Sequence, residues 1–127
     1  MNHFDQKNTQ LRTDRSIFLC LVVRLYNIPL STAVVAEQLL MSEFRIKDKA
    51  YATNNPIEVT TLGALKLCCE RDNVSVDFTS LQLALDLNEV KVTRAYLRLV
   101  EKYEGKALPE PEDSRQSNMC FNILKCS

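Results

Sequence analysis

The stretch PIEVTTLGALKLCCERDNVSVDFTSLQLALDLNEVKVTRAYLRLVEKY, residues 56–103, decides the fold. It predicts a helix that begins at Pro56, because Asn55 can cap the helix and proline suits the first helical position. Glu58 sits where a capping box places an acidic side chain. Gly63, in the middle of this helix, lowers its stability by about 1 kcal/mol relative to alanine. That cost predicts a close crossing by another helix at Gly63, so we expect this helix to be central and the most buried.

Two more helices are predicted within the same stretch. The polar residues 71–73 end the helix that begins at Pro56. Asp77 then caps a short helix that runs to about Asp86. After a tight turn, Asn88 caps a longer helix that runs to about Glu104. A short helix, a tight turn and a longer helix make a helix-turn-helix arrangement.

Two helices are predicted upstream of this stretch. The first runs from about Thr9 to Tyr26, and the second from about Leu30 to Lys47, with Asn-Ile-Pro at 27–29 as the break between them. In the first helix an apolar stripe recurs at helical spacing, while Arg15 and Arg24 lie off it. The stripe consists of Ile17, Phe18, Leu21 and Leu25.

The predicted fold is therefore all-α, a single five-helix domain over residues 11–104. No segment alternates apolar and polar residues as a half-buried strand does. Residues 1–10 are predicted to form a flexible N-terminus and residues 105–127 a linker and tail, because KALPEPEDSRQS is polar and contains proline. The apolar patch Met119–Leu124 within the tail can dock on the domain or on a partner.

Composition excludes several classes of function. The chain has 127 residues, with 16 basic and 16 acidic side chains, so its formal net charge is zero and any DNA contact needs a local stripe. None of the five cysteines forms a CxxC pair and His3 is the only histidine, so we expect no metal, no cofactor and no catalytic residue. Cys68 and Cys69 are predicted to pack in the core.

No apolar run reaches the roughly 20 residues of a membrane span, and the first fifteen residues lack the apolar stretch of a signal peptide. We therefore expect an intracellular protein without a membrane partner. We also expect no small-molecule substrate.

Residues 56–103 resemble the second half of a cyclin repeat of the transcription factor IIB family. The segment EVKVTRAY at 89–96 matches the family's entry into its last helix, and RLYNIP at 24–29 matches its junction between the first two helices. The resemblance covers about residues 11–104, which is one cyclin box without the family's zinc ribbon or its second box. It implies a nuclear, non-enzymatic initiation-type factor that binds duplex DNA or transcription proteins. The sixth subunit of the origin recognition complex uses similar boxes, so replication machinery is a related alternative.

The last predicted helix carries a basic stripe. Its residues Lys91, Arg94, Arg98 and Lys102 fall within about 80° of one another around a helix with 100° per residue. On the second helix of a helix-turn-helix, such a stripe is placed for phosphate contacts. In the family's register Thr93 occupies the base-reading position and Arg94 follows it. The candidate DNA-binding residues are thus Lys91, Thr93, Arg94, Arg98 and Lys102.

Two alternative interpretations stay open. The basic stripe also suits the solvated face of an amphipathic helix, because charges from Asp77 to Lys106 cancel. Tyr96 and Tyr103 can stack on bases, but their apolar side of the helix favours packing in the core or at its rim. The alternative function is a protein-interaction module of cyclin type, which binds a kinase or a scaffold protein through its groove.

Overall fold

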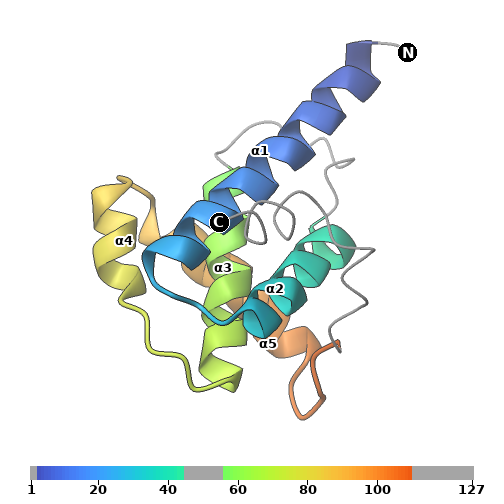
Figure 1. Cartoon of the computed structure of the whole chain (residues 1–127). Helices are drawn as coiled ribbons and strands as arrows, with labels where there is room; N and C mark the ends of the chain where they lie inside the picture. Colours follow the sequence, from blue (N-terminus) through green and yellow to red (C-terminus); the bar gives the residue numbers. More distant parts are fainter. Residues whose placement is uncertain (1–2, 45–55, 110–127) are drawn as a thin grey trace.

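Helix α3 (Pro56–Arg71) runs through the middle of the molecule and contacts α1, α2 and α5 (Figure 1). Its residues 59–69 are all buried except Lys66, which is half-buried. The predicted start at Pro56 and the predicted central position of this helix are both confirmed. The structure, a computed structural model of the whole chain, describes residues 3–44 and 56–109.

Within these ranges the fold is all-α, as predicted. The remaining helices are α1 (His3–Leu25), α2 (Leu30–Glu43), α4 (Phe78–Ala84) and α5 (Glu89–Lys102). Helix α1 begins at His3, earlier than the predicted start at Thr9. The predicted cap at Asn55 and the patch Met119–Leu124 lie outside the described residues. No helix in the described ranges is long and apolar enough to cross a membrane.

The crossing of α3 and α5 takes place at Gly63. A Cβ atom placed on Gly63 would lie 2.8 Å from the Cβ atom of Ala95 and 3.0 Å from the backbone nitrogen of Tyr96. Real Cβ atoms do not approach their neighbours this closely. The close crossing that the mid-helix glycine predicts is therefore confirmed, and it brings α5 directly against the central helix.

Three of the helices end in the same way, with a left-handed residue that is not glycine. Asn27, Asn73 and Asp86 have φ values of 53°, 56° and 53°. After each, the next amide donates to a carbonyl five residues back, as from Val74 to Cys69 at 2.8 Å. This six-to-one bond is that of a Schellman motif, and short polar side chains tolerate the left-handed conformation that it needs. The residue after each turn, Ile28, Val74 or Leu87, then packs on the core.

Of the four residues in the apolar stripe on the first helix, Phe18 packs against the core and the other three are exposed. Ile17, Leu21 and Leu25 are 38%, 60% and 69% exposed. The residues that α1 buries lie on the opposite arc of the helix and include Leu19, Cys20, Val22 and Val23. Both arcs of α1 are apolar, so their spacing alone does not distinguish them.

The arc that faces inward includes Arg15, which is 6% exposed and donates from Nη1 to the carbonyl oxygen of Phe44 at 2.8 Å. This bond also fixes the end of α2. Phe44 leaves the helical conformation with φ −123° and ψ 67° and turns a buried ring into the core. Helix α2 thus ends at Glu43 and not at Lys47 as predicted, because tertiary contacts to Phe44 replace the next helical turn.

Candidate interaction face on α4 and α5

Local capping bonds set the positions of α4 and α5. The Asp77 carboxylate accepts from the Ser80 backbone amide at 3.1 Å and from the Ser80 hydroxyl at 2.6 Å. These bonds to the charged form hold the pKa of Asp77 below its usual value. Asn88 Oδ1 accepts from the Val90 amide at 2.9 Å and caps α5. Both predicted caps are confirmed, and residues 85–88 form the short link between the two helices.

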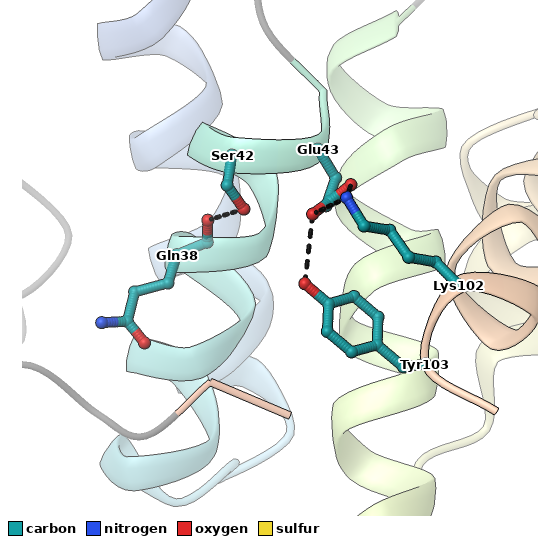
Figure 2. A network of polar contacts seen from close by, with 5 residues as sticks. All are labelled: Gln38, Ser42, Glu43, Lys102 and Tyr103. Carbon is teal, nitrogen blue, oxygen red and sulfur yellow. Dashed lines mark hydrogen bonds and ion pairs between the residues drawn. The ribbon is translucent and has the colours of Figure 1, made fainter. Parts of the chain in front are cut away.

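The C-terminal end of the basic stripe is occupied by an internal contact. Lys102 Nζ lies 2.6 Å from Glu43 Oε2 at the end of α2, and the Tyr103 hydroxyl donates to Glu43 Oε1 at 3.1 Å. Figure 2 shows Glu43 between these two side chains. Lys102 therefore joins α5 to α2, and its charge is balanced by a carboxylate that is itself only 10% exposed.

The next residue of the stripe also faces α2. The Arg98 guanidinium lies over the Phe44 ring, 5.1 Å from its centroid, in a cation–π contact. Phe44 is also the residue whose backbone carbonyl accepts from Arg15, so both its backbone and its ring take part in contacts between helices. Two of the four basic residues predicted to contact DNA thus make structural contacts at the α2–α5 seam.

Lys91 and Arg94, near the start of α5, remain available at the surface. Arg94 is exposed and Lys91 is half-buried, and neither forms an ion pair with another residue of the described ranges. Thr93 is half-buried and lies about 140° around the helix from the middle of the stripe. The five predicted residues therefore do not form one surface. Lys91 and Arg94 share one side of α5, and Thr93 lies apart from them.

A second face of α5 points away from the core and was not predicted. Val90, Arg94, Leu97 and Glu101 follow one another at spacings of four, three and four residues, which places them within about 60° on the helix. Val90 is 56% exposed and Leu97 is 51% exposed. We call these four residues the outer face of α5. The seven-residue spacing of Val90 and Leu97 is the signal in the sequence that would have indicated it.

The end of α4 adds more exposed apolar side chains. Leu83 in α4 is 77% exposed, and Leu85 in the link to α5 is 39% exposed. Over the same segment, Phe78, Leu81 and Val92 are buried. The helices α4 and α5 thus bury one set of apolar side chains in the core and expose a second set to solvent.

Tyr96 is held within the molecule and does not present a free ring for base stacking. Its hydroxyl donates a hydrogen bond to Glu70, and the Lys66 ammonium lies 4.8 Å from the ring centroid. The hydrogen bond to Glu70, assisted by burial, raises the pKa of Tyr96 to about 12. Burial and the hydrogen bond to Glu43 raise the pKa of Tyr103 as well. Both tyrosines pack against the core, as the core interpretation predicts.

The buried thiols are suited to packing and not to nucleophilic chemistry. Burial raises the pKa of Cys68 to about 12 and that of Cys69 to about 11. Both side chains are 1% exposed, so the thiols stay protonated at neutral pH and out of reach of solvent. The described ranges contain no cluster of three or more histidine, cysteine or carboxylate side chains that could hold a metal ion.

The chain was compared with models of known protein families, with curated proteins and with solved structures, and none of the three comparisons found a match.

Proposed function

We propose that this chain is a non-catalytic protein-interaction module that binds its partner through the outer face of α5 and the adjoining end of α4. The observation that supports the proposal is the exposure of Leu83, Leu85, Val90 and Leu97 within one short segment of the domain. Large apolar side chains gathered at a surface are typical of interaction sites. The proposal keeps the alternative function given by the sequence, a protein-interaction module, but assigns the contact surface to α4 and α5.

A partner helix with apolar residues at matching spacing would fit this face. Complete burial of a valine or leucine side chain stabilises a contact by about 1.5–3 kcal/mol, and the side chains on α5 are half exposed before binding. Arg94 lies between Val90 and Leu97, and Glu101 follows them, so charged residues flank the apolar positions. Such flanking charges contribute more to the choice of partner and its register than to affinity.

The proposal is tested by co-purification from the native cell with the full chain. Leu97→Glu places a charge in the middle of the outer face, whereas Leu21→Glu places one in the exposed apolar stripe of α1 (60% exposed), so the pair of variants distinguishes these two surfaces. Because both sites are exposed, each substitution should change the free energy of unfolding by no more than about 0.5 kcal/mol. We expect the partners of the wild type to be retained by Leu21→Glu and lost by Leu97→Glu. Retention of all partners by a folded Leu97→Glu variant would contradict the proposal.

A second candidate function, binding of duplex DNA in a transcription factor IIB-like manner, is favoured by Lys91 and Arg94. Both lie near the start of the second helix of the helix-turn-helix, where side chains approach the groove and its phosphates. The resemblance to the cyclin box supports this candidate. The internal contacts of Arg98 and Lys102 weaken this candidate, because two of the side chains predicted to contact phosphates are engaged with Phe44 and Glu43 instead.

A further inference from the structure

The described chain contains a cavity of about 550 Å³ on the side of α2 and α3, separate from the outer face of α5. Its apolar lining consists of Pro29, Val35, Cys68, Val74, Leu108 and Pro109. At its edge the Thr32 hydroxyl donates to Asp72 Oδ2 at 2.6 Å. The volume lies in the range of cavities that bury a ligand or several apolar side chains. The cavity is thus large and mainly apolar, and its charged lining residues are Arg71 and Asp72.

The chain that follows α5 is fixed along one wall of this cavity. Arg71 Nη1 donates to the carbonyl oxygen of Lys106 at 2.8 Å, and Nη2 donates to that of Tyr103 at 2.9 Å. Leu108 packs against the core. Although the predicted linker begins at Gly105, residues 106–109 therefore lie against the domain. Pro109, the last described residue, is itself part of the cavity lining.

We propose that the apolar segment Met119–Leu124 of the same chain occupies this cavity. The sequence MCFNIL provides the large apolar side chains that such a lining accepts, and Lys125 follows it as a counterpart to Asp72. Residues 110–118 connect the segment to the cavity wall, and the entropic cost of closing a loop rises only slowly with its length. Tethering keeps the segment at a millimolar effective concentration, about that of two sites on a short linker. The proposal does not depend on the proposed function, since it concerns a different surface.

The proposal is tested by nuclear magnetic resonance on the full chain. In the wild type we expect nuclear Overhauser contacts between the Phe121 ring and the methyl groups of Val35 and Val74. In the double variant Phe121→Asp/Ile123→Asp we expect those methyl resonances, and that of Leu108, to shift. The matched control Gln116→Asp/Ser117→Asp adds the same charge just before the segment and should leave them in place.

Two results would overturn the proposal. The first is the absence of contacts between Phe121 and the methyl groups of Val35 and Val74 in the wild type. The second is a set of contacts that disappears on dilution, because that result would assign the cavity to the segment of a second copy. The wild-type measurement decides the question even if the double variant does not fold.

Discussion

At the residue scale, asparagine and aspartate perform the role that glycine has in most helix ends. Asn27, Asn73 and Asp86 all adopt positive φ, and each turn sets the next apolar residue on the core. The chain has only two glycines, and of these Gly105 has positive φ while Gly63 lies inside a helix. Asparagine and aspartate tolerate positive φ with less strain than other side chains. Substitutions at these three turns therefore test how much the residue type contributes to stability.

Asn73→Ala is expected to lower the free energy of unfolding by about 1 kcal/mol, because alanine is strained in the left-handed conformation. Asn73→Gly is expected to leave the protein at least as stable as the wild type, since glycine has no Cβ atom to strain. Denaturant unfolding measures both changes, with Ser75→Ala as the control at a nearby exposed site. Equal stabilities for the alanine and glycine variants would contradict this account of the turn.

The second residue-scale prediction concerns alkaline pH. The Tyr96 pKa is raised from about 10 to about 12, so the folded state keeps a proton that the unfolded state loses between these values. The contribution of Tyr96 to stability should thus be fully present below pH 10 and be lost as the pH rises toward 12. Tyrosinate absorbance of the wild type minus that of Tyr96→Phe isolates this group. Because the hydrogen bond to Glu70 is the main cause, Glu70→Gln should move its titration to lower pH, and an unchanged titration would exclude that cause.

At the element scale, the fold depends on how closely α3 and α5 approach. The contact at Gly63 involves backbone atoms of α5, which have less freedom to move than a flexible side chain. This contact also determines which side of α5 faces solvent. Val92 and Leu99 are buried on the side that packs on α3, so the outer face lies on the opposite side.

Gly63→Ala is expected to destabilise the domain by up to about 2 kcal/mol, which is the overpacking cost of about 1–3 kcal/mol reduced by the roughly 1 kcal/mol of helix propensity gained from alanine. Gly63→Leu should destabilise it more. The double variant Gly63→Ala/Ala95→Gly removes the nearest atom, the Ala95 Cβ at 2.8 Å, and should recover part of the loss. Thermal unfolding followed by circular dichroism measures the series. An unchanged melting temperature in Gly63→Ala would mean that α5 moves away at little cost.

The elements that the sequence predicted are those with local chemical signals. Asp77 and Asn88 cap their helices through amides two or three residues away, and Pro56 begins α3, so short-range patterns were sufficient. The burial of Arg15 depends on the Phe44 carbonyl, 29 residues along the chain, and no local pattern indicates it. The same holds for the candidate site. The basic stripe on α5 follows from spacing, but the contact of Lys102 with Glu43, 59 residues away, decides how much of it stays free.

At the scale of the whole molecule, the charges balance, and within the basic stripe of α5 only Lys91 and Arg94 are free of the contacts with α2. The formal net charge is zero, so long-range attraction to a polyanion is weak. Any binding of DNA therefore depends on direct contact by basic side chains at a few positions. Lys91 and Arg94 are such positions, whereas the Lys102 charge is neutralised by Glu43. Arg94 belongs both to the outer face of α5 and to the basic stripe. A substitution at Arg94 therefore affects both proposed functions. Measuring protein partners and duplex DNA with the same variant shows which of the two functions is lost.

If the domain binds duplex DNA, Arg94→Ala should flatten the slope of log affinity against log salt concentration by about 0.9, the contribution of one phosphate contact. Lys102→Ala should change the slope less, because Lys102 is paired with Glu43 in the free protein. Fluorescence anisotropy of a labelled duplex, measured over a range of salt concentrations, provides both slopes. The protein-interaction proposal makes the opposite forecast: no variant binds duplex DNA even at low salt, while Leu97→Glu loses its protein partners. A steep salt dependence in the wild type, unchanged partner binding in Leu97→Glu and a reduced slope in Arg94→Ala would together establish the DNA-binding alternative.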